Sequence, residues 1–126
     1  ITLTVKPPTS PFTVRCDPHQ LESALVNLVE NALKFTPAQG YVQVGAQADS
    51  GEGGVRIWVK DSGVGIAPAE QPRIFQRFYR GKQATNGGSG LGLAIVQSVM
   101  HAHGGRVTVG SVEGEGSRFE LHLPID

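Results

Sequence analysis

Polar side chains of types that bind metal ions and phosphates recur on one side of a segment near the N-terminus. Residues 20–36 read QLESALVNLVENALKFT, and at about 100° per residue their apolar side chains fall on one arc of a helix. The opposite arc carries Asn27, Glu30, Asn31 and Lys34, three or four residues apart. An amide oxygen is a hard ligand that suits Mg²⁺, while a nearby lysine and glutamate supply a phosphate contact and a base. The alternative is a solvated face, although each mid-helix asparagine costs about 0.6 kcal/mol relative to alanine.

Asp61 is a second candidate, because it continues an apolar alternation. Every second residue of the expected strand 55–61 is apolar, so Asp61 points to the same side as the core residues. A carboxylate there needs a partner, since burying it unpaired is costly. Gly63 and Gly65 let a flat ligand approach the backbone, and a purine amino group would satisfy the carboxylate. The alternative is that Asp61 caps its own Asp-Ser-Gly turn.

A glycine-rich stretch precedes a second helical segment. Residues 88–93 read GSGLGL and lead into an apolar helix, so free backbone amides and the positive end of a helix dipole could face a phosphate. The stretch is no dinucleotide fingerprint, since no strand leads directly into it, and no P-loop, since no Gly-Lys-Ser/Thr follows. The alternative is plain flexibility, and we expect residues 81–90, which have nothing to bury, to be mobile.

Two arginines stand just before this loop. Residues 74–80 read IFQRFYR, and Arg77 and Arg80 place cationic groups where one of them could reach a terminal phosphate. The aromatic residues of the same stretch can anchor it in the core. The alternative is a surface turn with exposed arginines.

Composition limits the class of protein. The 126 residues suffice for one domain, and 11 basic against 11 acidic side chains argue against a nucleic-acid footprint or a polybasic membrane surface. A single cysteine, Cys16, excludes a disulfide framework and any multi-cysteine metal site. No apolar run approaches the roughly 20 residues that span a bilayer. Because the chain opens on Ile1 and a strand-like alternation, we expect residues 1–126 to be one domain of a longer protein.

Apolar periodicity indicates which elements position these residues. Alternating segments, which are typical of strands, cover residues 1–5, 12–16, 41–48, 55–61, 106–110 and 117–124. Helical periodicity covers residues 20–36 and 91–103, with one or two short helical turns within 68–79. Asp17 and Pro18 are the expected start of the first helix, and Gly104 and Gly105 the expected end of the second. We expect an α+β two-layer sandwich, with a mixed, mostly antiparallel sheet of about five strands and about three helices on one face.

Together, and in this order, these stretches resemble the catalytic and ATP-binding domain of two-component sensor histidine kinases. That family has the Bergerat fold and belongs to the GHKL superfamily with gyrase B, Hsp90 and MutL. The matching boxes are the N box at 27–36, the first glycine box at 61–66, the F box at 74–80, the second glycine box at 88–93 and the glycine turn at 114–119. Residues 103–105 resemble the family's usual helix ending. Departures are Gln76, where the family often has glutamate, and a short lid.

The resemblance implies a role for each candidate. Asn31 would ligate Mg²⁺, Asn27 would support the metal–phosphate site, and Glu30 would be the general base that polarises an acceptor histidine. Lys34 and Arg80 would hold phosphates, and Asp61 would accept a hydrogen bond from the adenine amino group. The residues shaping the adenine pocket and the mobile ATP lid would be Gly63, Gly65, Ile66, Arg77, Gly88, Gly90, Leu91 and Gly92.

The resemblance also implies a function and partners. The domain would bind Mg-ATP and transfer the γ-phosphoryl group to a histidine on the dimerisation domain of its parent kinase, for relay to a response regulator. The sequence context of that acceptor surrounds none of the four histidines, His19, His101, His103 and His122. The isolated domain would be monomeric, and the parent a homodimer that holds it in the cytoplasm, whether or not the parent is membrane-bound. No nucleic-acid partner is expected.

Two alternative functions stay open. One is a GHKL-type ATPase in which Glu30 activates water, which the F box disfavours. The other is a nucleotide-sensing module without transfer, which the presence of Glu30, Lys34 and Arg80 disfavours.

Overall fold

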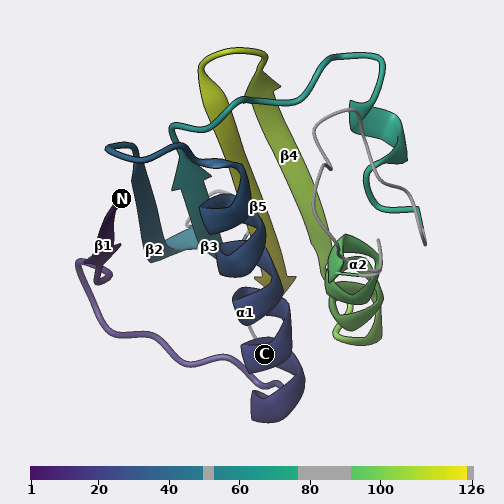
Figure 1. The fold of residues 1–126 in the computed structure, drawn as a ribbon. Coiled ribbons are helices and arrows are strands. Elements are labelled where there is room, and N and C mark those ends of the chain that lie inside the picture. The colour runs from purple at the N-terminus through teal and green to yellow at the C-terminus, as the bar shows by residue number, and fades with distance from the viewer. Residues whose placement is uncertain (50–52, 77–91, 125–126) are drawn as a thin grey trace.

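The fold is an open sheet with two α-helices on one face (Figure 1). The computed structural model describes residues 1–49, 53–76 and 92–124. Its strands are β1 (Thr2–Lys6), β2 (Tyr41–Asp49), β3 (Gly54–Asp61), β4 (Arg106–Val112) and β5 (Gly116–Pro124). They form one five-stranded sheet in the order β1-β2-β3-β5-β4, in which β1 and β2 are parallel and the other pairs antiparallel. The predicted mixed, mostly antiparallel sheet of about five strands is confirmed.

The first helix, α1 (Pro18–Phe35), begins and ends where the sequence predicts. The Asp17 carboxylate accepts hydrogen bonds from the backbone N–H groups of His19 and Gln20, at 3.0 and 3.2 Å. Pro18 occupies the first turn, where its missing N–H has no helical partner to lose. At the other end Thr36 has extended backbone geometry, because Pro37 disfavours the helical conformation in the residue before it.

The second helix, α2 (Gly92–Ala102), ends in a glycine cap. Gly104 has φ +71°, the N–H of Gly105 donates to the carbonyl of Met100 at 2.8 Å, and that of Gly104 donates to the carbonyl of His101 at 3.1 Å. This pair of bonds is the Schellman arrangement. Within the described residues the third helical element is a single 3₁₀ turn, η1 (Gln71–Arg73), so two α-helices and one turn stand where about three helices were expected.

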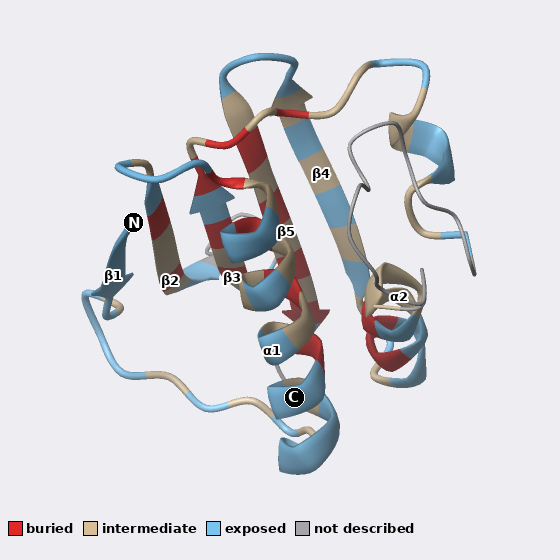
Figure 2. Ribbon diagram, in the orientation of Figure 1, coloured by how far each residue is buried: buried red, intermediate tan, exposed pale blue. Residues whose placement is uncertain are grey.

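The core lies between the helices and the middle of the sheet. Buried bands cross β3 and β5 in Figure 2, and inward-pointing residues of β3 face inward-pointing residues of β5, as in the pair Val59–Phe119. α1 packs over β3 and β2, and α2 packs over β4 and β5. Neither α1 nor α2 is long and apolar enough to cross a membrane, and the described residues hold no other α-helix.

One expected strand does not form. Residues 12–16 have no strand partner, although Phe12, Val14 and Cys16 are half-buried while Thr13 and Arg15 are exposed. Phe12 and Val14 pack against the core as an extended segment leading into α1. Alternation of side chains therefore predicted the burial correctly and the hydrogen bonding wrongly, since period-two alternation requires extended backbone but not a neighbouring strand.

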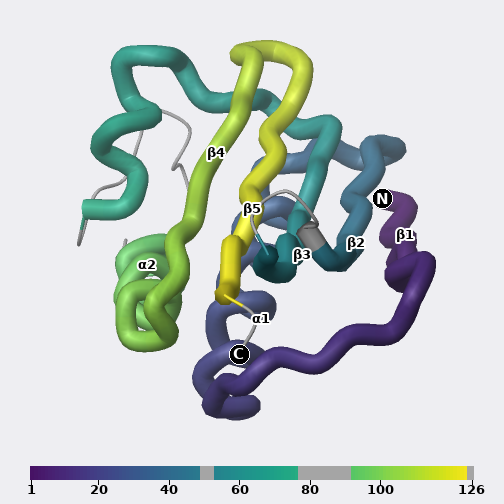
Figure 3. The backbone as a smooth tube through the Cα atoms, turned by 180° about the vertical axis from the view of Figure 1, so that it is seen from behind, coloured from purple at the N-terminus to yellow at the C-terminus, as the bar shows by residue number. Residues whose placement is uncertain are grey.

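The opposite face of the sheet is polar. Viewed from behind in Figure 3, the strands lie in front of α1. There the indole of Trp58 covers Gly45, whose missing side chain makes room for it, and the Arg118 guanidinium lies 4.8 Å from the Trp58 ring centre. Glu120 accepts a hydrogen bond from Arg118 at 2.7 Å and lies 3.8 Å from Arg56. This face is a paired, charged surface, as is usual for the exposed side of an antiparallel sheet.

Candidate functional site

Asp61, the last residue of β3, is a buried carboxylate with one committed oxygen. Asp61 is 5% exposed, and its Oδ1 accepts hydrogen bonds from the backbone N–H groups of Gly63 at 2.8 Å and Ser117 at 3.3 Å. Within the described part of the chain, no hydrogen bond reaches Oδ2. Burial raises the pKa of the Asp61 carboxyl, and the two backbone hydrogen bonds oppose that shift. The bond to Gly63 is the turn cap that was the alternative interpretation, and it occupies only one of the two carboxylate oxygens.

Asp61 belongs to a row of polar residues that the sequence reasoning missed. Across the strand register Asp61 faces Ser117 of β5, and Ser117 faces Ser111 of β4. The two serine hydroxyls lie 2.8 Å apart, and Ser117 is buried. The signal that finds Asp61 also finds these serines, because each continues the inward-pointing apolar positions of its strand. Polar residues thus replace apolar ones at one end of three neighbouring strands.

The loop after Asp61 is held close to α1 by its glycines. The N–H of Val64 donates to the carbonyl of Phe35, the last residue of α1, at 3.2 Å. A Cβ on Gly63 would stand 2.5 Å from that carbonyl oxygen, so no side chain fits there. Gly65 has φ +73°, and a Cβ on it would stand 2.2 Å from the carbonyl oxygen of Val112. The loop therefore needs glycine at both positions in order to lie between the helix and the turn that joins β4 to β5.

The far end of this loop is held by two polar residues that were not predicted. The N–H of Ile66 donates to the Ser111 hydroxyl at 2.8 Å. The Gln71 side-chain amide donates to the carbonyls of Ile66 at 3.0 Å and Ser111 at 3.3 Å. Ile66 is half-buried against the core. No sequence signal identifies Gln71, because its partners lie five and forty residues away.

The predicted side chains on the polar face of α1 differ in how far they are exposed. Asn27 and Asn31 are half-buried, while Glu30 and Lys34 are exposed. The Asn27 amide donates to the carbonyl of Ser23 at 2.8 Å, which leaves its oxygen turned toward α2. That Oδ1 lies 3.0 Å from the point where a Cβ on Gly92 would stand.

Gly92 and Leu93 are the described part of the second glycine box, and Gly92 meets Asn27 of the N box directly. The other predicted residues of the lid region, Arg77, Arg80, Gly88, Gly90 and Leu91, lie outside the described residues. The expected mobility of residues 81–90 also falls there. Of the F box, Phe75 packs edge to face against Phe119 with ring centres 6.2 Å apart, as the expected aromatic anchoring requires.

The donor set fits a hard cation carried by a nucleotide. Among the described residues no group of three or more His, Cys, Asp and Glu side chains is placed to hold a metal. Mg²⁺ keeps few protein ligands when phosphates supply the rest, and the half-buried amide of Asn31 would suit that role.

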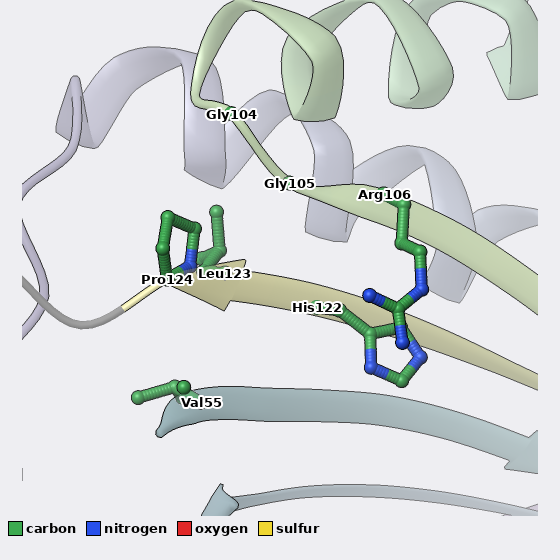
Figure 4. Close-up of a pocket in the computed structure, with 8 residues that line it drawn as sticks. Val55, Gly104, Gly105, Arg106, His122, Leu123 and Pro124 are labelled. Carbon is green, nitrogen blue, oxygen red and sulfur yellow. The ribbon is translucent and has the colours of Figure 1, made fainter. Parts of the chain in front are cut away.

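A hollow lies at the opposite end of the sheet, far from this chemistry. Figure 4 shows it between the glycine cap of α2, the end of β5 and the start of β3, with a volume of about 350 Å³. Arg106 and His122 lie side by side on one wall, and Val55, Leu123 and Pro124 form the other. None of the candidate site residues lines it.

Known proteins share both the sequence pattern and the fold. The family described as Histidine kinase-, DNA gyrase B-, and HSP90-like ATPase matches residues 16–126. The phosphate regulon sensor protein PhoR of Pseudomonas aeruginosa is 43% identical over 107 residues, which are 82% of this chain and 24% of PhoR. The mycobacterial sensor histidine kinase MprB superposes with a TM-score of 0.87 at 34% identity, covering 98% of this chain and 82% of that one. Full-length ShkA in complex with AMPPNP superposes with a TM-score of 0.83 at 40% identity, covering 97% of this chain and 25% of that one.

The fold of this domain is thus the fold found in solved sensor histidine kinases. The chain belongs to the histidine kinase, DNA gyrase B and HSP90-like ATPase family. The resemblance inferred from the five boxes is confirmed, and ATP binding is the property this family implies. The chain spans about a quarter of the length of PhoR.

Proposed function

We propose that this domain binds Mg-ATP between α1 and the Asp61 loop and transfers the γ-phosphoryl group to a histidine. The observation that carries the proposal is the geometry of Asp61: a buried carboxylate whose Oδ1 is used by the protein and whose Oδ2 receives no hydrogen bond from the described residues. Adenine carries an amino donor on its edge, and hypoxanthine, its closest analogue, carries an acceptor there instead. A buried acceptor of this kind discriminates strongly between the two.

The remaining residues act by positioning and charge. Gly63 and Gly65 let the flat base approach the backbone, and Lys34, Asn31 and Asn27 follow along α1 from the Asp61 loop toward Gly92. Bound magnesium would neutralise phosphate charge, with Asn31 as its protein ligand. Arg77, Arg80, Gly88, Gly90 and Leu91 are proposed to close over the nucleotide. Phosphoryl transfer needs placement and electrostatic stabilisation more than covalent help, and this inventory supplies both.

Glu30 is proposed to act on the acceptor. Its carboxylate is exposed, so an imidazole from another domain can reach it. By accepting the hydrogen bond of one imidazole nitrogen, Glu30 raises the nucleophilicity of the other. The bond from phosphorus to the bridging oxygen breaks, a P–N bond forms, and ADP leaves.

The proposal includes the wider protein. Residues 1–126 are taken as one domain of a longer, homodimeric sensor kinase, whose dimerisation domain carries the acceptor histidine and which passes the phosphoryl group to a response regulator. The isolated domain is taken as monomeric and has no nucleic-acid partner. It is taken as a cytoplasmic domain, and this holds for a membrane-bound parent as well as for one outside the membrane.

The test is a transfer assay. The purified domain is mixed with a dimerisation hairpin carrying the acceptor histidine and with γ-labelled ATP, and we expect an acid-labile, base-stable label on the hairpin. Asn31→Ala should abolish Mg-dependent labelling in the complete kinase, because the amide ligand is lost. Labelling that persists in Asn31→Ala contradicts its role.

One observation favours a second candidate. The same exposure that opens Glu30 to an imidazole opens it to water, which would make the domain an ATPase. Steady phosphate release from the isolated domain, at a rate unaffected by the hairpin, would support the ATPase over the kinase. ATP bound without either reaction would support a nucleotide-sensing module.

A further inference from the structure

His103, the residue after α2, has a partner for each ring nitrogen. The backbone N–H of Asp17 donates to its Nε2 at 2.9 Å. Its Nδ1 lies 2.8 Å from the carbonyl oxygen of Val99. A carbonyl oxygen only accepts, so Nδ1 carries the proton and Nε2 offers its lone pair. The arrangement therefore requires the neutral imidazole.

The imidazole joins the two helices that flank the candidate site. Asp17 is the N-cap of α1, and His103 directly follows the last residue of α2. The helices run antiparallel and pack against each other, and at the far end of the pair the Asn27 amide faces Gly92. The segments between these two contacts are about 15 Å long on α1 and about 16.5 Å on α2, at 1.5 Å per residue. One end of a matched helix pair thus carries the imidazole, and the other carries two of the residues proposed to bind the nucleotide.

We infer that His103 is a positioning residue for nucleotide binding, which fixes how far α2 extends along α1 and so holds Gly92 against Asn27. The inference rests on the proposed function. The spacing at the far contact is tight, because a Cβ on Gly92 would already stand 3.0 Å from the Asn27 oxygen. Interactions of a helix N-terminus fall off within its first turn, so a small slide of α2 changes what its first residues offer to a phosphate.

The contact responds to protonation of the ring. A proton on Nε2 would face the Asp17 N–H, and the hydrogen bond between them would be lost. The charged and titratable groups nearest to this contact along the chain are Arg15, Cys16 and Asp17 before α1, His19 in its first turn, and His101 on α2. The Asp17 carboxylate is already held by the first turn of α1.

Three variants separate positioning from general stability. His103→Gln keeps an acceptor at about the distance of Nε2 and removes the titration. His103→Leu removes both hydrogen bonds. His101→Gln is the matched control, two residues earlier in the chain. Affinity for Mg-ATP is measured by calorimetry at pH 6 and pH 8, at a temperature where circular dichroism shows each variant folded.

We expect His103→Leu to bind about five- to tenfold more weakly at pH 8, within the range of coupling between distant sites. His103→Gln should bind within about twofold of wild type at pH 8 and lose less affinity than wild type on acidification to pH 6. His101→Gln should follow wild type. The ratio of the ATP affinities of wild type and His103→Gln cancels the titration of the ATP phosphates and of Asp61, because these are the same in both proteins. The Asp17 amide resonance should move with His103 protonation in wild type and stay fixed in His103→Gln.

Each outcome decides something. If wild type binds ATP and both His103 variants bind it with the same affinity and the same pH dependence as wild type, the inference is overturned and the proposed function stands. If His103→Leu does not fold, the pH comparison of wild type with His103→Gln decides alone. If wild type binds no ATP, the proposed function fails and the inference fails with it, whatever the Asp17 resonance shows.

Discussion

The two ends of the β3–β5 strand pair differ in the residues that line them. At one end, the last residue of β3 meets the start of β5, and a buried carboxylate lies beside a buried serine. At the other end, the start of β3 meets the end of β5, and a hollow of about 350 Å³ opens between backbone segments. The end with the evident cavity offers mostly glycine backbone and apolar walls, with Arg106 and His122 on its rim. At the Asp61 end the described residues donate no hydrogen bond to Oδ2 of a buried carboxylate, and this acceptor is what identifies the candidate site.

The comparison predicts its largest effect at Asp61. In Asp61→Asn the amide oxygen can still accept from Gly63 and Ser117, but the amide N–H₂ then faces the donor of adenine. We expect ATP affinity to fall by about 10²-fold, since a buried donor facing a donor is left unpaired. The unfolding free energy at pH 7 should not fall, because the substitution removes a buried charge whose pKa is raised by desolvation.

Its control lies at the other end of the strands. His122→Gln should change ATP affinity by less than about twofold, because His122 lies at the opposite end of the strand pair from Asp61. Calorimetry and thermal denaturation of both variants measure the two effects. A loss of affinity in His122→Gln that matches the loss in Asp61→Asn would remove the distinction between the two ends.

A smaller effect concerns the backbone of the site end. Gly65→Ala puts a Cβ 2.2 Å from the Val112 carbonyl oxygen and places an L side chain at φ +73°. We expect the free energy of unfolding to fall by about 2–3 kcal/mol, from the clash and the left-handed backbone together. Urea denaturation measures it.

Gly110 in β4 is the matched control for this substitution. A Cβ there meets nothing within 4 Å, and its backbone has no positive φ. Gly110→Ala should therefore be neutral or slightly stabilising. Equal losses in the two alanine variants would show that the Gly65 loop is not held as tightly as its contacts indicate.

The smallest expected effect is the pH dependence of the site end. Because the folded-state pKa of Asp61 is raised, the folded protein holds this proton at pH values where the unfolded chain has lost it. The group's contribution to the free energy of unfolding therefore falls as pH rises from the ordinary aspartate range through the raised pKa. Nucleotide affinity runs the other way, since only the carboxylate accepts from the adenine amino group.

We expect ATP affinity to weaken as pH falls from 8 toward the raised pKa of Asp61, because the protonated carboxyl no longer accepts from the adenine amino group. When this loss of affinity is measured in the His103→Gln variant, His103 does not contribute to it. It should be absent when Asp61→Asn is added. A step of the same size in that double variant would assign the titration to another group.

Much of this fold follows from local rules. The start of α1 was predicted from Asp17 and Pro18, because an N-cap acceptor and a proline in the first turn act within a few residues. The inward direction of Asp61 followed from alternation along β3 alone. The same reasoning failed for residues 12–16, because pairing with another strand is not a local property. It also gave about three helices, where the described residues hold two α-helices and a 3₁₀ turn.

The sequence by itself determined on which side of their element the candidate residues lie, since helix and strand periods are properties of the backbone. The tertiary structure alone decided which of them meet. The row Asp61–Ser117–Ser111 depends on strand register, and the joining of His103 to Asp17 spans 86 residues. Contacts of that kind arise when elements pack, and the free energy that selects them is shared by the whole core.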